Sequence, residues 1–269
     1  MEYGMPFLLE TRSLEDAAAL CRDLGLSFVE LNMNFPQCGL NRLKADALNR
    51  LKDAYGIYFT LHLEESLNPF DLNPLVREAY LQTLRGALKL ARAIGAPVAN
   101  LHLPKGVFIT LPDERVYLFA RYAREYMQSV LALRALCERE ADGSPLLLCV
   151  ENTDGFAGHE KAAVERLLES PVFGLTLDIG HSHAAGDADL PFYQTHADRL
   201  RHMHVHDARG TANHQALGSG EIDLPARLEA ARSAGARVVL ETKTVEALKA
   251  SVRWLSQFPE EWAQPFGKS

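Results

Sequence analysis

The sequence has few cysteines, and none of them forms the close pairs that bind zinc or brace a small disulfide-rich fold. The four thiols, Cys21, Cys38, Cys137 and Cys149, are spread along 269 residues without a CxxC motif. Disulfide frameworks and thiolate zinc sites both depend on closely spaced cysteines, so neither is expected. This usage is typical of a reducing compartment, and we expect a cytoplasmic location.

Long apolar segments are also missing, because no run approaches the roughly 18 residues that a membrane-spanning helix needs. The first ten residues contain Glu2 and no basic start, which is unlike a secretory signal peptide. Positive charge is in short supply as well, with 28 Lys and Arg against 35 Asp and Glu and a net charge of -7. We therefore expect no membrane partner, and nucleic acid is less favoured, although a local basic patch can survive an acidic balance.

The sequence does contain a regular alternation of short apolar runs with longer segments of helical spacing. The runs of strand type cover 5–9, 26–32, 57–63, 97–103, 145–152, 172–179, 201–207 and 237–241, the first being the weakest. The helical patterns cover 13–24, 41–54, 74–94, 113–140, 160–169, 189–199, 224–234 and 244–257. The chain thus reads as eight strand-then-helix units.

Eight such units predict a parallel sheet with helices outside it, and their number in about 250 residues favours a (β/α)8 TIM barrel of the α/β class. The alternative is an open, doubly wound sheet. No GxGxxG or GxxxxGK[ST] motif follows an early strand, which removes the usual evidence for a nucleotide-binding sheet of that kind. No low-complexity linker divides the chain, so we expect one domain over residues 1–269.

Histidine and carboxylate side chains stand at the ends of nearly all the predicted strands from the third to the eighth. In a barrel these ends meet at one mouth, where catalytic residues lie. The strand-end residues are His62, His102, Glu151, Asp178, His204 and Glu241. The loops that follow add His181, His183, His206, Asp207, Arg209 and His214.

Each of these residues alone is more often a hydrogen-bonded structural group than a metal ligand. Six of them at one mouth would gather charges of one sign, which is costly unless cations neutralise them. The set therefore favours a divalent metal site, and imidazole with carboxylate but no thiolate suits Zn(II), Mn(II), Fe(II) or Co(II). His202 would lie deeper, as a core or supporting histidine, whereas His183 and His206 could serve either purpose. His159 and His196 fall in helical stretches and are expected at the surface.

The ordered motifs resemble the xylose isomerase-like TIM-barrel superfamily. That superfamily contains sugar phosphate isomerases and epimerases together with abasic-site nucleases of the endonuclease-four type, AP endonuclease family 2. The resembling segments are LHL at 61–63, NLHLPKG at 100–106, VENTDG at 150–155, LDIGHSHAAG at 177–186, HVHDARG at 204–210, HQALGSGEID at 214–223 and LET at 240–242. The ordered set is specific to the superfamily and not to one activity.

The resemblance implies two metal sites that share one carboxylate. The ligands common to the epimerases and the nucleases match Glu151, Asp178, His204 and Glu241. A second site, found in the nuclease branch, matches His62 and His102 with Glu151 bridging. We therefore expect two divalent ions per chain, of Zn, Mn, Co or Fe.

A third site is expected to be incomplete. His181 and His214 match residues that bind a third metal in the nucleases, and the residue matching His181 contacts substrate in the sugar enzymes. The nuclease pattern has an aspartate two positions before the histidine that matches His214. This chain has Ala212 there.

The favoured activity is that of a metal-dependent sugar or sugar-phosphate isomerase or epimerase. As in the enzymes it resembles, Glu151 and Glu241 would carry protons beside a carbonyl that the metal polarises. The residues expected to contact substrate are His181, His206, His214 and Arg209. The partner would be a small sugar, and a homo-oligomer is left open.

The alternative is a metal-dependent abasic-site endonuclease or phosphodiesterase, a hydrolase. His62 and His102 count in favour of it, and Ala212 counts against it. The loop after the second strand offers a single arginine, Arg42, where a DNA-binding protein needs several phosphate contacts. A third, non-enzymatic interpretation is a barrel that has kept its metal sites for binding alone.

Overall fold

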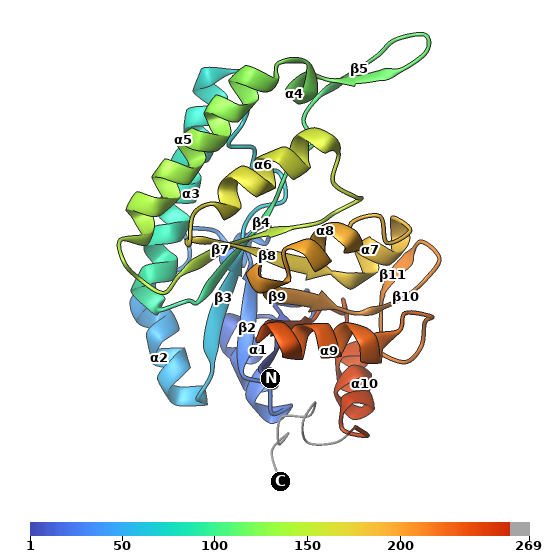
Figure 1. The fold of residues 1–269 in the computed structure, drawn as a ribbon. Helices are drawn as coiled ribbons and strands as arrows, with labels where there is room; N and C mark the ends of the chain where they lie inside the picture. The colour runs from blue at the N-terminus through green and yellow to red at the C-terminus, as the bar shows by residue number, and fades with distance from the viewer. Residues whose placement is uncertain (259–269) are drawn as a thin grey trace.

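The protein, described here by a computed structural model over residues 1–258, is built around a closed barrel of eight parallel strands (Figure 1). The barrel strands are β1 (Tyr3–Pro6), β2 (Phe28–Asn32), β3 (Tyr58–His62), β4 (Val98–His102), β7 (Leu147–Glu151), β8 (Phe173–Asp178), β9 (Leu200–Val205) and β12 (Arg237–Leu240). They follow one another around the barrel in sequence order, and β12 closes it against β1. The predicted (β/α)8 fold is confirmed. Residues 259–269 of the expected domain lie outside the described residues.

Helices cover the outside of the barrel between successive strands. They are α1 (Leu14–Asp23), α2 (Ala45–Tyr55), α3 (Pro74–Ile94), α4 (Leu118–Arg121), α5 (Ala123–Ala141), α6 (Gly158–Leu168), α7 (Ile179–Ala184), α8 (Leu190–Thr195), α9 (Leu224–Ala234) and α10 (Val245–Leu255), with short 3-10 turns η1 (Pro36–Cys38) and η2 (Ala197–Arg199). Ser13 and Thr244 begin α1 and α10 by accepting backbone N–H groups. Gly56 and Gly95 end α2 and α3 at a φ of 65°, which suits glycine. None of the helices in the described part could cross a bilayer.

Apolar side chains fill the layer between the strands and these helices. Leu61, Leu101, Val150, Leu177 and Met203, from five neighbouring strands, are each at most 3 % exposed. Because side chains alternate along a strand, the residues before and after them point the other way, into the barrel. The polar strand-end residues therefore share the barrel interior.

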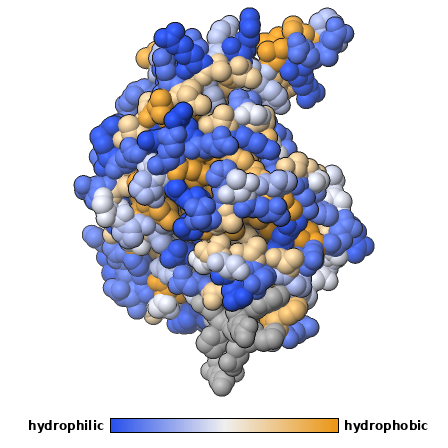
Figure 2. Space-filling model, in the orientation of Figure 1, coloured by the Kyte–Doolittle hydropathy of each residue, from blue (hydrophilic) through white to orange (hydrophobic). Residues whose placement is uncertain are grey.

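The segment 113–140, which we expected to be one helix, is divided. A hairpin of β5 (Phe108–Thr110) and β6 (Arg115–Tyr117) comes first, and Tyr122 then separates α4 from α5 with a non-helical ψ of 49°. The β-branched and aromatic residues on either side of Pro112 and Asp113 suit a hairpin. This hairpin projects beyond the barrel and bears exposed apolar residues (Figures 1 and 2). A second small hairpin, β10 (Asp207–Arg209) with β11 (Ala212–Gln215), lies after β9.

One buried carboxylate lies among the helices, outside the barrel interior. Glu160, in the first turn of α6, is 1 % exposed, and its Oε2 accepts the backbone N–H of Ala157 at 2.7 Å. Burial raises the pKa of Glu160 to about 7. The folded protein therefore prefers the neutral acid more strongly than the unfolded chain does.

Replacing Glu160 by Gln is expected to stabilise the protein at pH 8 and to change little at pH 5. The pKa of Glu160 in the folded protein lies above the ordinary value of 4.5. Its contribution to the free energy of unfolding is therefore complete below pH 4.5 and is lost as the pH rises through about 7. The full shift corresponds to about 3 kcal/mol, and a glutamine oxygen can still accept from Ala157. Chemical denaturation at both pH values measures the free energies of unfolding; equal stabilities at pH 8 would contradict the expectation.

Candidate active site

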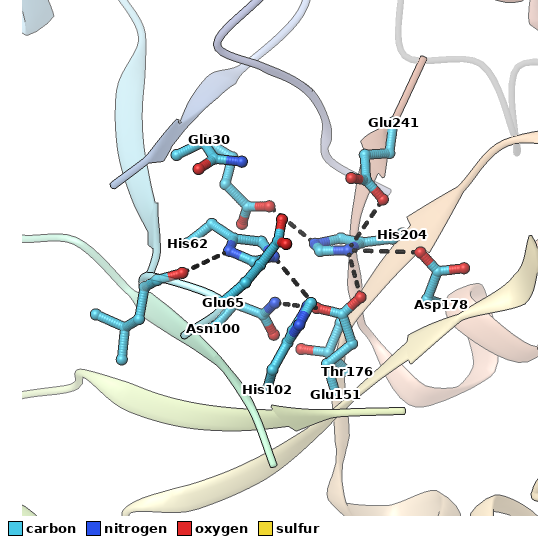
Figure 3. Close-up of polar contacts among 12 residues, drawn as sticks. Glu30, His62, Glu65, Asn100, His102, Glu151, Thr176, Asp178, His204 and Glu241 are labelled. Carbon is cyan, nitrogen blue, oxygen red and sulfur yellow. Dashed lines mark hydrogen bonds and ion pairs between the residues drawn. The ribbon is translucent and has the colours of Figure 1, made fainter. Parts of the chain in front are cut away.

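Neighbouring strands bring the predicted metal ligands to the C-terminal end of the barrel. His102 on β4 pairs in register with Glu151 on β7, and Asp178 on β8 pairs with His204 on β9. Glu241 directly follows β12, which pairs with β9. Their side chains converge inside the barrel (Figure 3).

Carboxylate oxygens of three residues, Glu151, Asp178 and Glu241, gather around Nδ1 of His204. This nitrogen lies 3.1 Å from Oε1 of Glu151, 3.3 Å from Oε2 of Glu241 and 3.9 Å from Oδ2 of Asp178. One ligand atom from each of the four residues lies within 4.8 Å of the others. Ligands held at about 2.1 Å from one ion are about 3.4 Å apart in a tetrahedron, so this spacing suits a divalent metal.

One oxygen of Glu241 lies close to His204 but receives no hydrogen bond within the described residues. Its Oε1 accepts a hydrogen bond from Lys243 at 2.8 Å. Its Oε2 is buried, and within residues 1–258 no group donates a hydrogen bond to it. A buried carboxylate oxygen without a donor is costly, so the donor set fits a metal ion by this test as well.

Glu151 stands between this first set of ligands and a second one. Its Oε2 lies 3.1 Å from Nε2 of His102 and 3.4 Å from Nε2 of His62, and it accepts a hydrogen bond from the Asn100 amide. Nδ1 of His62 donates to the carbonyl oxygen of Leu63 at 2.9 Å, so Nε2 is the nitrogen turned toward Glu151. The two imidazoles and this carboxylate could hold a second ion.

Opposite charges are buried together in the cluster. Burial alone would lower the pKa of His204, but the carboxylates of Glu151, Glu30 and Glu241 raise it well above its usual value. Burial alone would raise the pKa of Glu151 and Glu241, yet His204 holds both well below their usual range. A protonated His204 is thus the counter-charge of these carboxylates, a part that a divalent cation would take over on binding.

His206 supports Asp178 from behind. Its Nε2 donates to Oδ1 of Asp178 at 3.1 Å, and its Nδ1 accepts the backbone N–H of His214 at 2.7 Å. A Cβ on Gly180 would lie 1.9 Å from the ring, so the ring packs directly on the backbone of α7. We expected His206 to contact substrate; it is 0 % exposed, and both of its ring nitrogens are engaged within the protein.

His181 and His214 lie toward the rim of the mouth. Nδ1 of His181 is 3.4 Å from Oδ2 of Asp178, and the two imidazole rings are 5.8 Å apart between centroids. Nδ1 of His214 donates to the carbonyl oxygen of Glu241 at 3.1 Å. Burial lowers the pKa of His214 to about 4, so the ring is neutral at pH 7 and its Nε2 carries a lone pair.

The sequence interpretation missed Glu30, which lies in the middle of β2 and is 2 % exposed. Each of its oxygens is 2.8 Å from Nε2 of a histidine, Oε1 from His204 and Oε2 from His202. Burial would raise the pKa of Glu30, but the two imidazoles hold it far below its usual range. The prediction that His202 lies deep in the barrel is confirmed. A charged residue inside the apolar run LSFVELN was the signal that could have identified Glu30.

Comparison with known proteins agrees with the barrel fold. Residues 18–258 match the family described as the xylose isomerase-like TIM barrel. The chain belongs to this family. It is 25% identical over 225 residues to an uncharacterized protein of Methanocaldococcus jannaschii, which covers 79% of this chain and 74% of that protein.

Solved structures share the fold of this xylose isomerase-like barrel at low sequence identity. A D-tagatose 3-epimerase-like protein superposes with a TM-score of 0.78 at 22% identity, over 96% of each chain. The IolI protein with a bound zinc atom superposes with a TM-score of 0.75 at 16% identity, over 98% of this chain and 100% of that one. At these identities the likeness shows the fold alone.

The structure also gives the surroundings of Arg209 and His159. Arg209 is exposed, and its guanidinium donates to the carbonyl oxygen of Ser219 in its own loop. Among the residues described, no hydrogen bond or ion pair joins Arg209 to the cluster. His159, expected at the surface, is half-buried: its Nε2 donates to the carbonyl oxygen of Lys105, and its ring lies 5.7 Å from that of Tyr126.

The loop that carries His214 is organised by a single buried carboxylate, that of Asp207. Asp207 is 1 % exposed and accepts four backbone N–H groups at distances between 2.8 and 3.2 Å. The donors are Ala208, Gly218, Gly220 and Ile222. Asp207 thereby fixes the path of the chain on both sides of His214.

Replacing Asp207 by Asn is expected to loosen this loop. Each oxygen of Asp207 accepts two N–H groups and the amide nitrogen of asparagine accepts none, so one of the two pairs loses its acceptor, at a cost of about 1–3 kcal/mol for each group. A lower melting temperature and faster hydrogen exchange, at Gly218 and Gly220 or at Ala208 and Ile222, would report the change. Asp223→Asn is the matched control, because either residue can cap α9. Unchanged exchange in the Asp207 variant would contradict this assignment.

Proposed function

We propose that this protein is a divalent-metal-dependent isomerase or epimerase of a sugar or sugar phosphate. The observation that carries the proposal is the convergence of Glu151, Asp178 and Glu241 on Nδ1 of His204. A metal bound there would polarise a substrate carbonyl and make the adjacent C–H more acidic. The names of the epimerase-like and zinc-containing structural neighbours support the same chemistry.

Glu151 and Glu241 are the proposed proton carriers. Their strands, β7 and β12, are separated in the barrel by β8 and β9, which supply Asp178 and His204. The two carboxylates therefore flank the centre from different sides. In the proposed reaction one removes a proton from a substrate carbon, and the other delivers a proton to the opposite face.

The remaining residues have supporting parts in this proposal. His181 and His214, at the rim, bind the substrate, and the free Nε2 of a neutral His214 can accept a hydrogen bond from a substrate hydroxyl. His206 orients Asp178 and does not reach the substrate. Arg209 contacts substrate only if its loop turns the guanidinium away from Ser219.

A second function, cleavage of DNA at abasic sites, is favoured by one observation, the position of His62 and His102 beside Oε2 of Glu151. The local charges favour the sugar enzyme. Lys105 is paired with Asp154 at 2.5 Å, and Lys243 is paired with Glu241 at 2.8 Å. Cations that are already neutralised contribute little to phosphate binding.

The proposal is tested by incubating the protein in heavy water with Mn(II) or Co(II) and a panel of ketoses and aldoses, free and phosphorylated. Deuterium that enters a sugar carbon would support it. A nicking assay on abasic duplex DNA is run beside this screen with the same metal-loaded protein. Cut DNA without sugar exchange would overturn the proposal in favour of the nuclease. If neither deuterium exchange nor DNA cleavage is observed, the proposal is rejected in favour of a protein that only binds metal.

Replacing Glu241 by Gln is expected to lower turnover of an identified substrate by at least about 100-fold, because the amide cannot carry the proton. The fold should persist, since strand-end carboxylates at this face of a barrel serve chemistry before stability. Circular dichroism and the melting temperature check the fold. Glu229→Gln, a change to a half-exposed side chain on α9, is the control. Near-normal activity of the Glu241 variant would rule out this role.

The mouth is expected to hold two metal ions per chain and not three. A third ion would depend on His181 and His214, because Ala212 supplies no oxygen, and two neutral imidazoles alone bind a divalent ion weakly. Elemental analysis and anomalous scattering on substrate-free protein measure the number of metal ions bound per chain. Replacing His62 and His102 together by Ala should reduce it from two to one. Three fully occupied sites, one of them on His181 and His214, would overturn the expectation.

A further inference from the structure

Glu30 lies beside His204 in the barrel interior (Figure 3), and three side chains surround its buried carboxylate. Its Oε2 accepts hydrogen bonds from Nε2 of His202 at 2.8 Å and from the hydroxyl of Thr60 at 3.0 Å. Thr60 is also its direct neighbour across the β2–β3 pair. The other oxygen, Oε1, is thereby fixed 2.8 Å from Nε2 of His204.

This distance indicates where His204 carries a hydrogen. A nitrogen lone pair would be repelled by an ionised carboxylate oxygen 2.8 Å away, whereas an N–H group is attracted to it. We therefore expect the hydrogen on Nε2 of His204, although the N–H direction is not aligned for a hydrogen bond to Oε1. Nδ1 is then the nitrogen that is free to lose its proton, and it is the one that faces Glu151 and Glu241.

We propose that Glu30 is a positioning residue that selects Nδ1 of His204 as the metal-binding nitrogen. The proposal rests on the proposed function only in requiring a divalent metal at the cluster. Among the described residues, no hydrogen bond or ion pair joins Glu30 to Glu151, Asp178 or Glu241. Glu30 therefore acts through the ring of His204. A carboxylate behind a ligating histidine fixes its tautomer and orientation and makes it a stronger ligand.

A competing interpretation places an ion below the cluster. Ligand atoms of Glu30, His202 and His204 also lie within 4.8 Å of one another. An ion there would displace the hydrogen that Glu30 shares with His202 and would use Nε2 of His204 as a ligand. The two interpretations predict different numbers of bound ions when Glu30 is replaced. If Glu30 positions His204, the number stays the same and binding weakens; if Glu30 is a ligand of a lower ion, one ion is lost.

The decisive variant is Glu30→Gln, whose single oxygen can accept from only one of the two histidines. Zn(II) affinity is measured without substrate, by competition with a chromophoric chelator. We expect about 10–100-fold weaker binding with the number of ions unchanged. Glu160→Gln is the matched control, a buried glutamate outside the barrel interior, and it should bind Zn(II) as the unaltered protein does.

Nitrogen-15 spectra of histidine-labelled, Zn-loaded protein provide a second readout that does not depend on affinity. In the unaltered protein His204 should show a slowly exchanging hydrogen on Nε2 and a metal shift on Nδ1. Its signals are assigned by their loss in His204→Asn. In Glu30→Gln the Nε2 hydrogen should exchange faster or be lost.

Thr60→Val tests the same idea if Glu30→Gln fails to fold, because it keeps the side-chain shape and removes one hydrogen bond to Glu30. The loss of a single such bond should weaken Zn(II) binding by about 2–10-fold. Unchanged affinity in the folded variants, loss of a whole ion, or ligation through Nε2 would each overturn the proposal. A protein that shows the expected metal dependence but exchanges no sugar hydrogen keeps this inference and loses the proposed function.

Discussion

Carboxylates crowded into the barrel interior must have positive charge among them, and the rest of the site is arranged to supply it. Four of them are at most 9 % exposed: Glu30, Glu151, Asp178 and Glu241. Removing an unpaired charge from water costs several kcal/mol, so the cluster is stable only with protonated imidazole or a bound cation in place. His204 is at the centre of this balance, with Glu30 on one nitrogen and Glu151 and Glu241 on the other.

The surrounding elements keep these charges in position. The Asn100 amide and His102 hold one oxygen of Glu151, so that the other is turned toward His204. His206 holds Asp178, and the backbone of α7 at Gly180 leaves room for no larger residue against that ring. Such supports keep the atoms of the proposed ligands at fixed distances, which would lower the cost of ordering them on metal binding.

Much of the architecture followed from local patterns in the sequence. The eight apolar runs became the eight barrel strands within a few residues, because a strand buried between a barrel interior and a layer of helices must be apolar on its outer face. The prediction of a single helix over 113–140 was wrong. Its apolar residues satisfy helical spacing, but a turn at Pro112 and Asp113 allows the β-branched and aromatic residues before and after it to pair as β5 and β6.

The sequence alone determined which strands end in ligand-type residues, and hence that Glu151, Asp178, His204 and Glu241 would meet at one mouth, because parallel strands in a barrel share their C-terminal end. It could not determine which atoms touch. Glu30 and His202 are 172 residues apart, and they meet only because barrel closure turns β2 and β9 toward a common interior. Likewise, the burial of His206 behind Asp178 depends on how closely α7 approaches β9. The position of a residue in the sequence determines how far along its strand the side chain lies. Its partners across the barrel depend on how all the strands and helices pack together.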